Sequence, residues 1–113
     1  MQRVEGRLVL SPTDLTKHLA CAHATTLDLA VVAGAVEAPH VADDALTLIF
    51  ELGLEHERAY LASLRAEGRS ITEIPTAFDA DGRRRAEQQT LDAMRSGADV
   101  VYQGTFFDGS WGG

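Results

Sequence analysis

The segment 99–107, Asp-Val-Val-Tyr-Gln-Gly-Thr-Phe-Phe, places the strongest constraint on the fold, because it has the clearest strand pattern in the chain. Asp108-Gly109 follows directly and favours a two-residue hairpin turn. Ser110 and Trp111 should begin the returning strand, which has few residues before Gly113. So short a second arm leaves an apolar strand without its neighbour. We therefore expect these residues to be the first part of a longer domain.

Three helices are expected ahead of this strand. The first spans about residues 12–33, from an N-cap at Ser11 to a stop at Gly34. The second spans about residues 44–67 and the third about 82–96. Apolar residues at helical spacing predict the face that each helix buries. These faces comprise Leu15, Leu19, Ala22, Thr26 and Leu29 in the first helix, Leu46, Ile49, Gly53, Tyr60 and Leu64 in the second, and Ala86, Thr90, Ala93 and Met94 in the third.

Two short strands complete the expected elements. Residues 7–10 place Leu8 and Leu10 on one face, and residues 70–74 end at Pro75. Strands and helices in this order predict an α/β (α+β) domain, with helices packed on a small mixed sheet. No apolar run approaches the length of a membrane span, and the charged N-terminus is unlike a signal peptide. We expect a cytoplasmic protein with no membrane partner.

The composition excludes a disordered chain and argues against a simple coat for nucleic acid. Apolar residues make up 45% of the chain, and the net charge is -7. An acidic balance still suits an enzyme that gathers carboxylates around divalent cations. Arg83, Arg84 and Arg85 form the only basic run. This run is interpreted as the solvated start of a helix, with a phosphate contact as the alternative.

His56 is the best candidate for chemistry, because helical spacing puts it on the apolar stripe of the second helix. An inward histidine beside a small residue, here Gly53, can ligate a cation against a nearby sheet. Glu57 could add a carboxylate. The ordinary alternative is a hydrogen-bonded core histidine with a solvated Glu57. A zinc-protease helix is excluded, because no second histidine follows at the required spacing.

Cys21 is the only cysteine, so a disulfide within the chain is excluded. His18 lies three residues earlier and can share its helix face, whereas His23 points away. Two ligands do not make a closed zinc site. The remaining interpretations are a small buried thiol, or one ligand of an iron–sulfur cluster whose other cysteines lie outside this chain.

Three segments, in this order, resemble the RecB-like nucleases of the PD-(D/E)xK superfamily. Residues 10–23, with Leu-Ser-Pro-Thr-Asp-Leu and then His-Leu-Ala-Cys-Ala-His, are similar to the opening of these proteins. Residues 53–57, Gly-Leu-Glu-His-Glu, resemble their first motif, and residues 97–109 resemble the strand and turn that lead into the catalytic hairpin. The resemblance covers nearly the whole chain. It departs in one spacing, because many relatives have a longer interval than the one between Gly53 and His56.

The resemblance implies a restriction-endonuclease-like core, incomplete within residues 1–113, that hydrolyses DNA phosphodiester bonds in repair or recombination. His56 would bind Mg²⁺ or Mn²⁺ with Glu57 beside it. Cys21 would be the first of four ligands of a [4Fe–4S] cluster. The catalytic Asp and the Glu/Asp-x-Lys pair would follow Gly113, so we expect residues 1–113 alone to be inactive. The implied partners are DNA, as single strands or duplex ends, and the rest of the parent protein, which in larger relatives includes a helicase.

Two other functions agree with the same sequence. The chain could be a non-catalytic nucleic-acid-binding or scaffolding module that retains a degenerate nuclease fold. It could also be a helical protein-interaction domain unrelated to nucleases, in which the strand at 99–107 is absent or peripheral. Where the strand at 99–107 forms, its exposed edge could pair with another copy of the chain.

Overall fold

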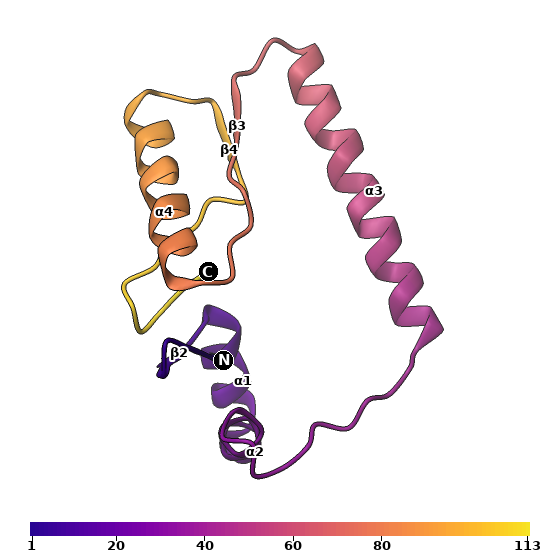
Figure 1. Ribbon diagram of the computed structural model, residues 1–113. Helices are drawn as coiled ribbons and strands as arrows, with labels where there is room; N and C mark the ends of the chain where they lie inside the picture. Colours follow the sequence, from indigo (N-terminus) through magenta and orange to yellow (C-terminus); the bar gives the residue numbers. More distant parts are fainter.

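The computed structural model describes all residues, 1–113, and has four helices and two small sheets of two strands each. In chain order the elements are β1 (Gln2–Val4), β2 (Arg7–Val9), α1 (Pro12–Ala20), α2 (Ala22–Val32), α3 (Asp44–Ala66), β3 (Ile71–Glu73), α4 (Ala80–Arg95) and β4 (Val100–Tyr102). The predicted α+β class is confirmed, but the expected single mixed sheet is wrong, because the strands form one antiparallel and one parallel pair in separate sheets. Helix α4 lies on one side of β3 and β4, and α3 stands on the other (Figure 1). None of the four helices has the length and apolar character needed to cross a membrane.

Strands β3 and β4 pair in parallel and are connected through α4. The strand predicted at 70–74 is confirmed at its centre, and pairing continues one residue further through a hydrogen bond from Ile74 N to Tyr102 O (3.0 Å). At the other end, the Ser70 amide and hydroxyl donate to Asp99 Oδ2 at 2.8 and 3.0 Å. These hydrogen bonds hold the pKa of Asp99 below its ordinary value. The pair of residues therefore fixes where the two strands begin.

Helix α4 buries the face that its spacing predicts. Ala86, Thr90 and Ala93 are buried, whereas Met94 is 57% exposed, which makes the expectation for that residue wrong. The Thr90 hydroxyl donates to Ala86 O (2.8 Å) and accepts from Thr105 N (2.9 Å). The helix starts two residues earlier than expected, because Asp79 caps it. Thr90 thus attaches the segment after β4 to the middle of α4.

The strand predicted over 99–107 divides into β4 and one arm of a hairpin. Gln103 has a left-handed φ of 57°, which ends β4 at Tyr102. A Cβ on Gly104 would lie 3.2 Å from Thr90 Cγ2, so the chain turns closely against α4 here. A single strand was therefore the wrong prediction, because contact with α4 bends the chain.

The predicted tight turn forms one residue later than expected, because Phe107 pairs with Gly112 and leaves Gly109 and Ser110 as its central residues. Asp108 N donates to Trp111 O (3.1 Å), and Phe106 and Gly113 exchange backbone hydrogen bonds of 2.9 and 3.1 Å. The Asp108 carboxylate accepts from Trp111 N (2.7 Å) and Ser110 N (2.8 Å), and these bonds lower its pKa. We call residues 106–113 the C-terminal hairpin.

The N-terminal hairpin of β1 and β2 was not predicted in full, since the sequence pattern indicated only residues 7–10. Its turn, Glu5-Gly6, has positive φ at both residues, 49° and 78°. The inward side chains are Val4 and Val9, at 9% and 2% exposure. Leu8 and Leu10, which the sequence places on one face, are only half-buried, and Val9 between them is the buried residue of β2.

The small core joins the two ends of the chain. Val4 and Val9 pack with Ala80, at the start of α4, and with Phe107 of the C-terminal hairpin. Backbone hydrogen bonds from Leu10 N to Ser110 O (2.8 Å) and from Gly112 N to Leu10 O (2.9 Å) reinforce this contact. The two termini consequently lie at the same end of the molecule (Figure 1).

The single helix predicted over 12–33 is wrong, because Cys21 has extended backbone angles (φ -158°, ψ 103°) and separates α1 from α2. Contacts across the break stabilise the bend. Lys17 Nζ lies 2.6 Å from Asp28 Oδ2, and His18 Nδ1 lies 2.9 Å from Thr25 Oγ1. In a continuous helix Lys17 and Asp28 would be about 16 Å apart along the axis.

A capping box begins α1. Ser11 Oγ accepts from Asp14 N, and the Asp14 carboxylate accepts from Ser11 N (2.8 Å). The Met1 ammonium also lies 2.6 Å from Asp14. Burial raises the pKa of the Asp14 carboxyl, but hydrogen bonds from the ammonium and from Ser11 bring it below the ordinary 3.8. The chain terminus is thereby held against the start of α1.

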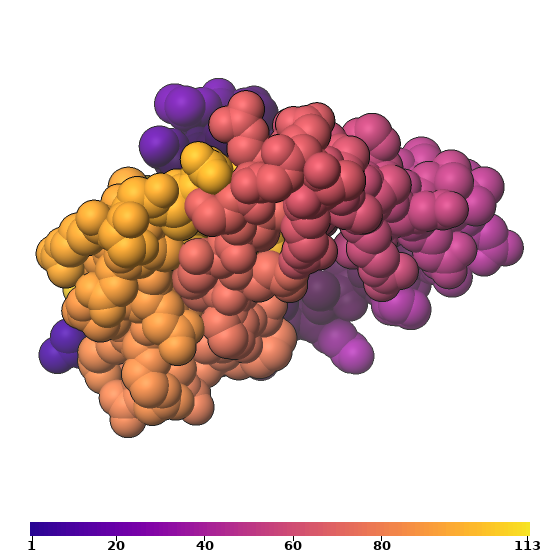
Figure 2. All heavy atoms as spheres, turned by 90° about the horizontal axis from the view of Figure 1, so that it is seen from above, coloured from indigo at the N-terminus to yellow at the C-terminus, as the bar shows by residue number.

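The faces that we expected the first and second helices to bury are largely exposed. In α3 only Leu61 is buried, while Ile49 and Tyr60 are 63% and 59% exposed. Leu15 and Leu19, in α1, are 49% and 77% exposed. The physical reason is that α3 projects from the body of the molecule (Figure 2). The radius of gyration, 17.1 Å, accordingly exceeds the ~13 Å of a compact domain of this length.

Replacing Thr90 with valine tests the link between α4 and the segment after β4. The change keeps the side-chain shape but leaves the Thr105 amide without its acceptor, so we expect a loss of about 1–2 kcal/mol in unfolding free energy. Urea unfolding followed by the fluorescence of Trp111 measures it. Thr16→Val is the matched control, since Thr16 makes the same kind of hydrogen bond to Pro12 O on an exposed face. Equal losses in both variants would contradict this role for Thr90.

Candidate functional site

Helix α3 carries both residues of the predicted metal site. It starts at Asp43, whose carboxylate accepts from the amides of Ala45 (3.0 Å) and Leu46 (3.1 Å). It ends as expected at Gly68, where φ is 81° and Arg69 N donates to Leu64 O (3.1 Å). The caps therefore fix both ends of α3, and His56 and Glu57 lie near the middle of the helix.

Glu57 connects α3 to the parallel sheet. Its Oε2 accepts a hydrogen bond of 2.6 Å from the hydroxyl of Tyr102, the last residue of β4. In the last turn of α3, Arg65 pairs with Glu73 of β3. These two exposed polar contacts join the helix to the strands. They hold α3 along the sheet although its apolar side chains do not pack there.

An open groove of about 510 Å³ runs along α3 next to Glu57. It is lined by Ile49, Phe50, Gly53, Leu54 and Glu57. Gly53 leaves free space, because a Cβ there would have no neighbour within 4 Å. The Glu57 carboxylate therefore lies at one end of an apolar groove, with its second oxygen, Oε1, free of hydrogen bonds to the chain.

His56 is exposed, which makes the prediction of an inward imidazole wrong. The stripe of α3 to which it belongs has no neighbouring element against which it could pack. The core-histidine interpretation is excluded in this structure for the same reason. Nowhere do three or more His, Cys, Asp or Glu side chains come close enough together to hold a metal ion. His56 and Glu57 remain neighbours on one helix, both accessible from solvent.

Cys21 is a free, exposed cysteine at the junction of α1 and α2. The buried-thiol interpretation is therefore wrong. The helical spacing that would have paired Cys21 with His18 does not apply, since the helix breaks at the cysteine itself. The imidazole of His18 instead contacts Thr25.

The three arginines of the basic run lie in different surroundings. Arg84 pairs with Asp81 at 2.9 Å, and Arg85 is exposed, as expected for the solvated start of a helix. Arg83 is partly buried, with its guanidinium carbon 5.7 Å from the centre of the Phe107 ring. Sequence spacing alone did not distinguish Arg83 from its neighbours. Its position depends on the distant C-terminal hairpin.

Comparisons with known protein families, with curated proteins and with solved structures found no match for this chain.

Replacing Tyr102 with phenylalanine tests the attachment of α3. Without the hydroxyl, Glu57 loses its partner and α3 keeps only the contact at Arg65, so its amides should exchange with solvent severalfold faster. Hydrogen exchange of residues 44–66, followed by mass spectrometry, is the measurement. Tyr60→Phe is the control, because that hydroxyl has no hydrogen-bond partner and lies on the same helix. Unchanged exchange in Tyr102→Phe would show that the contact does not hold the helix.

Proposed function

We propose that this chain is the N-terminal part of a RecB-like nuclease domain that cleaves DNA with the help of a divalent metal ion. The observation that carries the proposal is the hydrogen bond between Tyr102 and Glu57. It joins two of the three segments whose sequences resemble these nucleases, residues 53–57 and 97–109, although they are far apart in the chain. A helix with a His-Glu pair beside a central strand is the arrangement that the resemblance implies.

The side chains of His56 and Glu57 suit part of a metal site. Carboxylate oxygens are preferred ligands of Mg²⁺ and Mn²⁺, and the free Oε1 of Glu57 is available for one. Mg²⁺ requires near-octahedral coordination, mostly by oxygen, which one imidazole and one carboxylate do not complete. The proposal assigns the missing carboxylates to the Asp and the Glu/Asp-x-Lys pair expected after Gly113.

A bound metal ion would supply a polarised water and offset charge on the scissile phosphate. The residues of this chain would orient the Glu57 carboxylate and hold helix α3 beside the sheet. Tyr102 fixes the carboxylate of Glu57 by its hydrogen bond and leaves the other oxygen free. The caps of α3 and the ion pair between Arg65 and Glu73 keep the helix beside the sheet. Under the proposal, the exposed apolar stripe of α3 is covered by the remainder of the domain.

A cleavage assay with the complete encoded protein tests the proposal. We expect Mg²⁺- or Mn²⁺-dependent cutting of single-stranded or duplex DNA, and a loss of about 100-fold or more in His56→Ala, as for loss of a group that positions the metal. His40→Ala is the matched control, since His40 is exposed in the connection before α3. This variant should cut DNA as well as the original protein. Residues 1–113 alone should not cut.

Three results would count against the nuclease assignment. The complete protein could bind DNA without cutting it, which is the outcome expected of a degenerate, non-catalytic module. His56→Ala and His40→Ala could have equal activity. Cutting by residues 1–113 alone would show that the metal site is complete without residues after Gly113.

Cys21 is proposed as one ligand of a [4Fe–4S] cluster in the complete protein. Its exposure at a helix break leaves the thiol free to take part in a site built with other segments. The anaerobically purified complete protein should show the visible absorption of such a cluster, and Cys21→Ser should remove it. His18→Ala should retain the band. An unchanged band in Cys21→Ser would contradict this role.

A further inference from the structure

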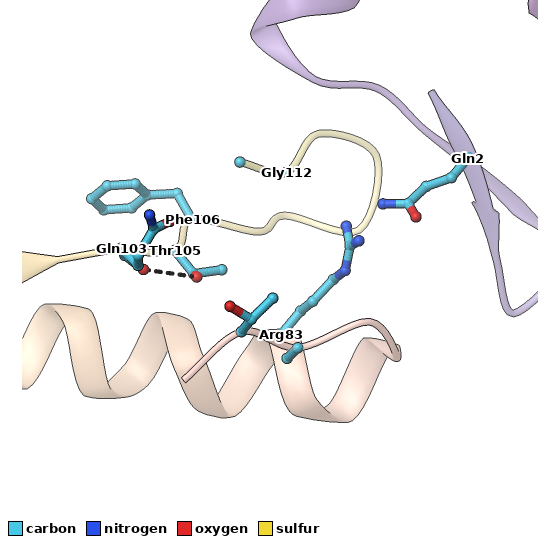
Figure 3. A pocket seen from close by; sticks show the side chains of 10 residues that line it. Gln2, Arg83, Gln103, Thr105, Phe106 and Gly112 are labelled. Atoms are coloured by element: carbon cyan, nitrogen blue, oxygen red, sulfur yellow. Dashed lines mark hydrogen bonds between the residues drawn. The ribbon is translucent and has the colours of Figure 1, made fainter. Parts of the chain in front are cut away.

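A cavity of about 260 Å³ lies between α4, the turn after β4 and the two ends of the chain. Figure 3 shows Arg83 rising into it from α4 toward Gln2 of β1. Ten residues line it, and Arg83 is the only charged one among them. The other polar side chains are those of Gln2, Thr76, Gln103 and Thr105. The volume is several times the ~30 Å³ that one water molecule occupies in the liquid.

Arg83 lacks an acidic partner in a strongly acidic chain. The sequence has 17 acidic and 10 basic side chains, yet no carboxylate pairs with this guanidinium. With its amide oxygen turned toward Arg83, Gln2 accepts from Nη1 (2.9 Å) and from Nη2. The Nε–H is buried without any hydrogen-bond partner. A buried unpaired donor on a charged group costs free energy, and such groups often mark a missing ligand.

Packing holds the guanidinium at this position. Its carbon lies 5.7 Å from the centre of the Phe107 ring. A Cβ on Gly112 would lie 3.3 Å from Arg83 Nη1 and 3.1 Å from Phe107 Cδ2, so the glycine lets the hairpin pass close to both. The charge is thus built into the fold and does not extend freely into solvent like that of Arg85.

We propose that this cavity binds a phosphate group, held by the guanidinium of Arg83 together with Gln2, Thr76 and Thr105. The planar fork of arginine can offer its Nη N–H groups to two oxygens of a phosphate. The amide and hydroxyl groups belong to separate segments around the cavity. Donors arriving from several directions suit a tetrahedral anion better than a planar carboxylate.

The phosphate can come from a DNA backbone or from the free ion. The DNA source rests on the proposed function, because a backbone phosphate held here would position a strand on the nuclease domain. Binding of free phosphate at this site does not depend on the proposed nuclease function. Titration of the 113-residue chain with inorganic phosphate therefore separates failure of this site from failure of the nuclease assignment.

The Nε–H resonance of Arg83 in a ¹H–¹⁵N correlation spectrum reports on the site directly, and its loss in Arg83→Lys assigns it. Added phosphate should shift this resonance and that of the Thr105 amide until saturation, at constant ionic strength. Arg83→Lys keeps the charge but loses the fork, and should weaken binding, measured by calorimetry, by about tenfold or more. Arg84→Lys is the matched control and should bind like the original chain.

Thr76→Val provides a second variant that leaves Arg83 and its packing in place. Thr76 is exposed and precedes α4, so this chain should fold normally and bind phosphate severalfold more weakly. Circular dichroism checks the fold of each variant. Absence of a saturable shift in the original chain, or equal affinity of Arg83→Lys and Arg84→Lys, would overturn the proposal.

A single-stranded oligonucleotide distinguishes the two sources. If it displaces phosphate and binds more weakly to Arg83→Lys than to Arg84→Lys, the site takes a backbone phosphate. If phosphate binds and the oligonucleotide does not compete, the site takes the free ion or a small phosphate ester. Both results support the site, and the cleavage assay with His56→Ala judges the nuclease assignment independently.

Discussion

The packing of Phe107 against Val4, Val9 and Ala80 is the contact on which the rest of the structure depends. Few side chains are buried, so no other cluster could replace this one if it were lost. Phe107 reaches the N-terminal hairpin because Asp108-Gly109 reverses the chain, and its amide is held by Glu87 Oε1 at 3.1 Å. Ala80 brings the start of α4 to the same point. The Arg83 cavity exists because these elements meet around an aromatic ring.

Helix α3, in contrast, has well-defined ends but almost no buried apolar contact. Its ends are well specified by the Asp43 cap and the turn at Gly68, but its apolar stripe remains exposed. A long amphipathic helix without a packed face is only marginally stable by its own hydrogen bonds. Two polar contacts, at Glu57 and Arg65, join it to the strands. The position of His56 relative to the sheet therefore depends on two solvent-exposed polar contacts, which are weak in water. A surface packed on the apolar stripe would stabilise that position.

Local signals in the sequence predicted the elements better than their packing. The cap at Ser11, a tight turn near Asp108-Gly109 and the spacing of Ala86, Thr90 and Ala93 in α4 all act within a few residues, so the sequence alone indicates them. The break at Cys21 and the bend at Gln103 depend on contacts with Asp28 and Thr90, which spacing does not show. The prediction of an inward His56 assumed a partner for α3. For the candidate site, the sequence indicated His56 and Glu57 but could not show that Tyr102 lies beside Glu57.

The pairing of Leu10 with Trp111 affects the order in which the chain acquires its structure. Strands β3 and β4 and helix α4 are close in sequence, so this unit can form early and without the N-terminus. The N-terminal hairpin gains its core partner Phe107, and its strand neighbour, only from the distant C-terminal hairpin. During synthesis, Val4 and Val9 remain unburied until the C-terminal hairpin has emerged from the ribosome. The earliest residues made thus become stable only after the C-terminal hairpin has been made.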